Sequence, residues 1–217
     1  MTLTTTPAAA VTADAVPVAP SPVPSSGRDR RSCGSAGPAV QQHWGTPVAF
    51  APMDPAGLLS PSAAEIGGAG PALETVPPGG IIADLETAAD RFRAAFEALT
   101  TAYEPEITPP VGDVGVEVQI WRHGYDRAPA RHRADLVAWW VLDATPGPAH
   151  TGSGAIAFAD PRAGSPMAPM PGRPWGRHLL IRPVPGTLVA VPGWLVSSVV
   201  PLERGQHVLV AIASSCR

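Results

Sequence analysis

The segment Val191-Pro-Gly-Trp-Leu-Val-Ser-Ser-Val-Val-Pro-Leu202 places a Pro-Gly turn between two short apolar runs. Residues 187–191 precede the turn and residues 195–200 follow it, and both runs are rich in valine. Short apolar runs that are bounded by Pro and Gly are typical of buried strands. The segment therefore predicts two strands separated by a turn.

Five further runs of the same kind lie in the C-terminal half of the chain. They are residues 116–121, 136–142, 155–158, 179–182 and 208–213. Seven short strands separated by turn signals are typical of a β-sandwich or a jelly roll. We therefore expect a mainly β fold.

One amphipathic helix is predicted before these strands. Asp84 is a good N-cap residue, and apolar residues recur behind it at spacings of three and four. This apolar stripe consists of Leu85, Ala88, Ala89, Phe92, Ala95, Phe96, Leu99 and Tyr103. A helix packed on a sheet is the expected arrangement. The Gly- and Pro-rich stretch from Gly67 to Gly80 is predicted to be a loop.

The quoted segment resembles the metal-site strand of the Fe(II)/2-oxoglutarate-dependent oxygenases. That family has Phe/Val-Pro-Ser/Gly-Trp-Leu, one residue and then a histidine, and Ser197 stands at the histidine position. Residues 183–191, 154–162 and 120–132 resemble three further family motifs in the same order. The resemblance covers about the last hundred residues and implies a double-stranded β-helix of the jelly-roll or cupin type, with one or two supporting helices.

The resemblance also implies roles for individual residues. The first family histidine corresponds to Ala130, and the second family histidine corresponds to His132. The arginine that pairs with 2-oxoglutarate in the family corresponds to His207. Non-haem iron is held by two histidines and a carboxylate, whereas alanine has no donor atom and a neutral hydroxyl is a poor iron ligand. Histidine also lacks the fixed fork of donors that arginine offers to a carboxylate.

His132 and Asp135 are the candidate metal ligands that remain. On a strand, their spacing places the two side chains on opposite faces, so joint ligation requires a bend or bulge in the backbone. Asp160 and Arg162, in Asp-Pro-Arg, are interpreted either as an ion pair at the end of a strand or as residues at a cavity mouth. Ser197 and Trp194 are the other pocket candidates.

Composition sets the outer limits on function. The chain has 217 residues, of which 28 are Pro and 22 are Gly, and it has a net charge of −3 and a pI near 6.0. We expect residues 1–42 to be a disordered Pro/Ala/Thr-rich tail and residues 43–217 to be one domain. The net charge does not indicate a surface that binds nucleic acid or an anionic membrane. The N-terminus resembles no signal peptide, so a cytoplasmic protein is expected.

Three hypotheses follow. The first is a degenerate oxygenase-like protein that acts as a binding or accessory subunit for a small molecule, a peptide or a protein partner. The second is an active dioxygenase that uses Fe(II) and 2-oxoglutarate, with ligands drawn from His132, Asp135, Asp160, His178 and His207. The third is a cupin-like enzyme with non-oxidative chemistry.

Overall fold

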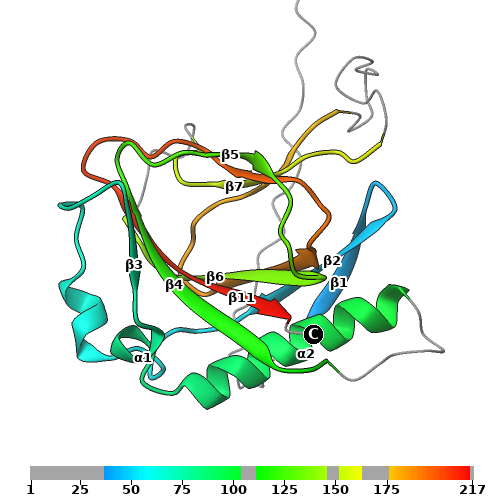
Figure 1. The fold of residues 1–217 in the computed structure, drawn as a ribbon, viewed down its shortest axis with the longest axis horizontal. Helices are drawn as coiled ribbons and strands as arrows, with labels where there is room; N and C mark the ends of the chain where they lie inside the picture. The colour runs from blue at the N-terminus through cyan, green and yellow to red at the C-terminus, as the bar shows by residue number, and fades with distance from the viewer. Residues whose placement is uncertain (1–36, 104–110, 146–151, 163–175, 216–217) are drawn as a thin grey trace, which may run out of the picture. The chain divides into compact units, whose positions relative to one another are not determined.

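The folded part of the chain consists of two antiparallel β-sheets and a long helix (Figure 1). The computed structural model describes residues 37–103, 111–145, 152–162 and 176–215. Most of the predicted N-terminal tail lies outside these residues. No helix in the described ranges is both long enough and apolar enough to cross a membrane.

The larger sheet has seven strands in the order β1-β2-β9-β6-β11-β4-β3. Their bounds are β1 Ala39–His43, β2 Thr46–Pro52, β9 Thr187–Pro192, β6 Leu136–Ala144, β11 His207–Ser215, β4 Val114–Arg122 and β3 Leu73–Val76. Neighbouring strands in this sheet pair antiparallel throughout.

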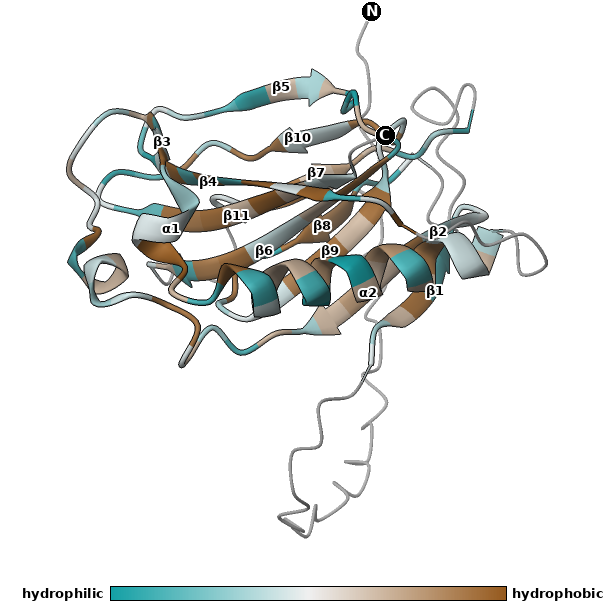
Figure 2. Ribbon diagram, turned by 60° about the horizontal axis from the view of Figure 1, so that its bottom comes forward, coloured by the Kyte–Doolittle hydropathy of each residue, from teal (hydrophilic) through white to brown (hydrophobic). Residues whose placement is uncertain are grey.

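The smaller sheet has four strands in the order β5-β10-β7-β8 (Figure 2). Their bounds are β5 Arg127–Ala130, β10 Ser197–Val199, β7 Ile156–Phe158 and β8 Leu179–Ile181. From β4 to β11 the chain alternates between the sheets, and only β7 and β8 follow each other in one sheet. Eight strands wound in this way form a double-stranded β-helix, or jelly roll. The predicted fold class is confirmed.

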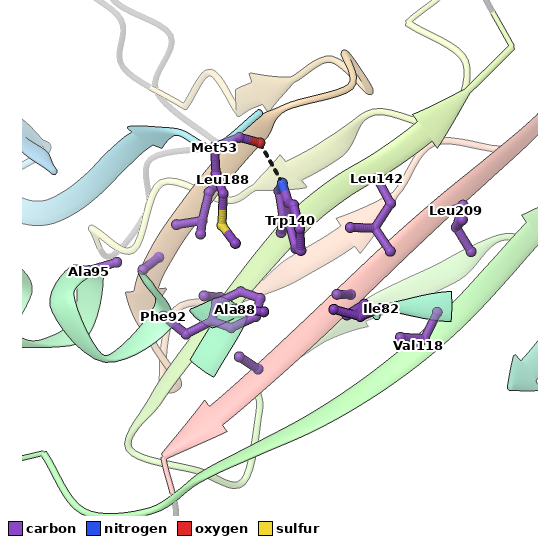
Figure 3. Packing of buried hydrophobic residues seen from close by; sticks show 14 of the residues in the cluster. Met53, Ile82, Ala88, Phe92, Ala95, Val118, Trp140, Leu142, Leu188 and Leu209 are labelled. Carbon is purple, nitrogen blue, oxygen red and sulfur yellow. Dashed lines mark hydrogen bonds between the residues drawn. The ribbon is translucent and has the colours of Figure 1, made fainter. Parts of the chain in front are cut away.

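The strands separate two apolar layers because successive side chains point to opposite faces of a sheet. Trp139 of β6 packs between the two sheets, where its ring meets Phe158 edge-on at 5.4 Å. Trp140 points to the other face and packs against the helix. There its indole N–H donates to the Met53 carbonyl at 2.9 Å, and its ring meets Phe92 edge-on (Figure 3).

The predicted helix is confirmed as α2, Leu85–Tyr103. The Asp84 carboxylate accepts from the Thr87 backbone N–H at 2.9 Å and from its hydroxyl at 2.7 Å, which caps the first turn. The middle of the apolar stripe is buried against the larger sheet, whereas Leu85 and Tyr103 at its ends are exposed. Hydrophilic bands on the open side of α2 are visible in Figure 2. Two short helices, η1 Pro61–Glu65 and α1 Pro78–Ile81, precede α2.

Two segments differ from the sequence-based expectations. Within the stretch predicted to be a loop, β3 pairs with β4 as an edge strand, so the loop prediction is wrong there. At the other edge, β1 includes residues 39–42 of the predicted tail. A two-residue turn joins β1 to β2, with Trp44 at φ 56° and Gly45 at φ 81°. Positive φ at both central residues is the geometry of a tight hairpin turn, which brings β1 into the sheet.

Candidate functional site

The two positions at which the sequence lacks the expected histidines face each other in the smaller sheet. Ser197 of β10 is the direct cross-strand partner of Ala130 of β5. Val199, two residues further along β10, belongs to the apolar layer between the sheets. Alternation therefore points Ser197 into the same space, where it is only 1% exposed. Ala130 is exposed, because β5 is an edge strand of the smaller sheet.

His132 lies just beyond β5, in a loop that is fixed to the turn between β9 and β10. Its backbone N–H donates to the Gly193 carbonyl at 2.8 Å, and the Gly193 N–H donates to the Asp135 carbonyl at 2.7 Å. A Cβ at position 193 would lie 1.8 Å from the Ala134 carbonyl oxygen. The Pro192-Gly193 turn thus anchors the loop that carries His132.

The imidazole of His132 is held as a neutral donor. Its Nδ1 accepts from the Ala134 backbone N–H at 3.1 Å, which places the ring proton on Nε2. Burial lowers the pKa of His132, the Arg127 cation lowers it further, and Glu117 opposes the shift. Binding a metal through Nε2 would require that proton to move to Nδ1 and the bond to Ala134 to break.

His132 lines an open pocket of about 450 Å³ at this end of the space between the sheets. Strands β4 and β11 supply one wall, and the β4–β5 connection with the start of β5 supplies the other. The lining residues besides His132 are Glu117, Gln119, Tyr125, Asp126, Arg127, Ala128 and Ile212. The pocket therefore brings charges of both signs together with a phenol and a neutral imidazole.

Polar side chains form a ladder along β4 toward this pocket. The Trp121 indole N–H donates to Gln119 Oε1 at 2.8 Å, and Gln119 Nε2 donates to Glu117. Trp121 also stacks on Tyr125, with 5.4 Å between the ring centres. Burial raises the pKa of Tyr125; Arg127 opposes this, and nearby carboxylates reinforce it. The phenol therefore stays protonated at neutral pH and can donate a hydrogen bond.

The residues present do not fit an iron centre of the type that the sequence resemblance implies. Ala130 has no donor atom. The Ser197 hydroxyl is buried and has no hydrogen-bond partner in the part of the chain that the structure describes, and the ring proton of His132 is on Nε2. Among the described residues, no group of three His, Cys, Asp or Glu side chains is arranged to hold a metal ion.

The structure places His207 apart from His132 and Ser197. On β11, Val208 belongs to the layer between the sheets and Leu209 to the layer beside the helix, so alternation puts His207 on the helix side. Its Nε2 is 3.1 Å from Asp143 Oδ2, and its Nδ1 is 2.7 Å from Thr145 Oγ1. His207 thus ties the ends of β6 and β11 together.

Asp135 and His178 also lie apart from the Ala130–Ser197 pair. Asp135 lines a second hollow, beside Trp194, together with His132, and its backbone carbonyl anchors Gly193. His178 is exposed just before β8.

Asp160 and Arg162 form the ion pair that the Asp-Pro-Arg motif allowed. The Arg162 side chain donates from Nε to Asp160 Oδ1 at 2.9 Å and from Nη2 to Oδ2 at 2.6 Å. The Arg162 and Gly176 backbone N–H groups add two donors, both at 3.1 Å. The Asp160 side chain is 1% exposed, so this carboxylate is a buried structural anchor at the end of β7.

We expect the contribution of Asp160 to stability to depend on pH. Its hydrogen bonds to Arg162 lower its pKa to about 2 from an ordinary value near 3.8. A lowered pKa stabilises the fold above pH ~4, and this stabilisation is lost as pH falls toward ~2. Asp160→Asn should lower the free energy of unfolding by about 1–2 kcal/mol at pH 7, because Arg162 is partly solvated. Urea unfolding at pH 7, 4 and 2.5 should show the deficit shrinking with acidity, and a constant deficit would contradict this assignment.

Glu117, Gln119 and Tyr125 were not singled out from the sequence, although a signal was present. Val-Glu-Val-Gln-Ile-Trp alternates between apolar and polar residues up to Trp121. Because the side chains of residues 117, 119 and 121 share one face, and Trp121 is buried between the sheets, this face was a candidate for a polar cavity wall.

Comparisons with known proteins give only distant structural likenesses. No protein-family profile matches the chain, and no curated protein matches it by sequence. A prolyl-4-hydroxylase from Pseudomonas putida is 17% identical, with a TM-score of 0.43, over 67% of this chain and 68% of that one. The α-ketoglutarate-dependent epimerase SnoN from nogalamycin biosynthesis is 16% identical, with a TM-score of 0.41, over 76% of both chains. AviO1 from Streptomyces viridochromogenes is 16% identical, with a TM-score of 0.39, over 79% and 90%.

Proposed function

We propose that this chain is an oxygenase-like jelly-roll protein that binds a small polar molecule or peptide, as a binding or accessory subunit, without an iron centre. The observation that carries the proposal is the cross-strand pairing of Ala130 with Ser197. Both positions face the space between the sheets, and neither supplies an imidazole. Two of the three ligand positions implied by the resemblance are therefore held by residues without an imidazole, and these two positions are direct cross-strand neighbours.

The open pocket that His132 lines supports a binding role. It offers the Tyr125 hydroxyl and the His132 Nε2–H as neutral donors, Arg127 as a cation, and Glu117 as an anion. A concave site with a few convergent polar groups suits a ligand that carries hydrogen-bonding groups of both kinds. The net charge of −3 gives no support to nucleic acid as that ligand.

The alternative, a dioxygenase with an unusual ligand set, finds less support in the geometry. Asp160 is engaged by Arg162, His178 is exposed, and His207 bonds to Asp143 on the helix side of the larger sheet. Within the described ranges, no three His, Cys, Asp or Glu side chains are arranged to hold a metal ion. The cupin-like alternative with non-oxidative chemistry has no specific observation in its favour.

Ligand-observed NMR with the full-length chain tests the binding role. Small polar metabolites and short peptides should be screened in the presence of a chelator, and hits should be compared between the native protein and Glu117→Gln. We expect hits that bind without metal and weaken in this variant. Glu86→Gln, an exposed change in the first turn of α2, is the matched control. Hits that require Fe(II), or that Glu117→Gln leaves unchanged, would overturn the proposal.

A further inference from the structure

A second hollow of about 460 Å³ lies where the end of α2 meets the loops that follow β5 and β9. Tyr103 comes from α2, Arg131 and Arg133 from the β5–β6 loop, and Trp194 from the β9–β10 turn. Trp194 is 45% exposed and Tyr103 is 43% exposed. Large aromatic side chains left open in a concave site are candidates for ligand contact.

The walls of this hollow are fixed by backbone hydrogen bonds. The two bonds between Gly193 and the β5–β6 loop hold Arg131 and Arg133 beside the turn that carries Trp194. The Leu195 N–H donates to the Pro192 carbonyl at 3.0 Å, which closes that turn. Because the framework is set in advance, a ligand would order few additional groups on binding.

The Tyr103 hydroxyl is protonated at neutral pH. Burial, the larger effect, raises the pKa of Tyr103, and the nearby Trp194 side chain opposes this shift. A protonated phenol can donate a hydrogen bond to a ligand.

The charges around the hollow favour an anion. Among the described residues that line it, Arg131 and Arg133 stand against a single carboxylate, that of Asp135, and His132 is neutral. A guanidinium group presents a planar fork of donors that matches the oxygen atoms of a carboxylate or phosphate.

We propose that this hollow binds a planar aromatic anion, with its ring against Trp194 and Tyr103 and its carboxylate or phosphate group on Arg131 and Arg133. The hollow shares His132 with the pocket that Glu117 and Arg127 line, but Tyr103, Trp194, Arg131 and Arg133 do not line that pocket, so the proposal does not rest on the function proposed for it.

Fluorine NMR tests this site with defined probes. The probes are 4-fluorobenzoate, 4-fluorophenyl phosphate and the neutral 4-fluorobenzyl alcohol, each titrated into the full-length chain. We expect the two anions to bind and the alcohol to bind at least roughly fivefold more weakly, the scale of a partly exposed charge interaction. A preference between the two anions would support the site and identify the oxygen group that it selects.

Variants assign the binding to this hollow. We expect two variants to bind the favoured anion roughly fivefold or more weakly than the native chain. They are the double variant Arg131→Gln/Arg133→Gln and the single variant Trp194→Ala. All three side chains are exposed, so the variants should keep the native unfolding midpoint. Arg91→Gln/Arg182→Gln removes the same charge from two other exposed positions and should leave binding unchanged. Equal binding of the alcohol, or equal losses in the two double-arginine variants, would overturn the proposal.

Discussion

Gly193→Ala is expected to unfold the protein or to destabilise it strongly. The added Cβ would lie 1.8 Å from the Ala134 carbonyl oxygen and 3.3 Å from the His132 carbonyl oxygen. These are backbone atoms, so relief requires the β5–β6 loop to move away and its two hydrogen bonds to Gly193 to break. We expect a loss of roughly 3–5 kcal/mol in the free energy of unfolding, in the upper range for single substitutions.

Urea unfolding, read by tryptophan fluorescence, measures this loss. Gly80→Ala is the matched control, because a Cβ at that helical position meets nothing within 4 Å. Replacing glycine in a helix without a clash is neutral or mildly stabilising. If both variants unfold at the native urea concentration, the β5–β6 loop is not anchored at Gly193.

The second large effect is a gain of metal binding. Ala130→His, His132→Asp and Ser197→His together would place two imidazoles and a carboxylate at adjoining positions, which is the ligand set of non-haem iron sites. Because Ala130 and Ser197 are direct cross-strand partners, their replacements should reach one ion. We expect the triple variant to bind Co²⁺ at least roughly a hundredfold more tightly than the native chain, as a second and a third ligand join a single donor.

Cobalt absorption spectra and calorimetric titration measure this gain in affinity for Co²⁺. Ser197 is buried beside Phe158, its partner on β7, so a histidine there risks overpacking. Ser197→Cys, which is close to serine in size and supplies a thiolate, therefore provides a second version of the triple variant. Each variant that lacks one of the three changes should bind more weakly. If both versions of the triple variant fold but bind Co²⁺ no more tightly than the native chain, the three side chains do not reach one ion.

The sequence predicted most of the elements that build the sandwich. The seven strands were recognised because each is a short apolar run between turn residues, and α2 because its apolar residues recur at helical spacing behind Asp84. The adjacent tryptophans of β6 point to opposite layers, as strand alternation requires. The pairing of Asp160 with Arg162 was one of two interpretations and is the one that the structure shows.

Other features depend on pairing that local sequence does not encode. Strand β5 reads Arg-Ala-Pro-Ala and β3 reads Leu-Glu-Thr-Val, and both are edge strands whose partners supply their stability. The position of His207 on the helix side depends on which face of β11 meets the smaller sheet. Motif spacing alone does not fix that face, because a shift of one residue would turn His207 toward the other layer.

Calorimetric titration of the metal-stripped, full-length chain with Fe(II), under anaerobic conditions and with 2-oxoglutarate present, tests the absence of an iron centre most directly. We expect no saturable heat of binding, because Ala130 and Ser197 supply no strong ligand and His132 carries its proton on Nε2. Micromolar binding that depends on 2-oxoglutarate and disappears in His132→Ala would contradict the proposed function.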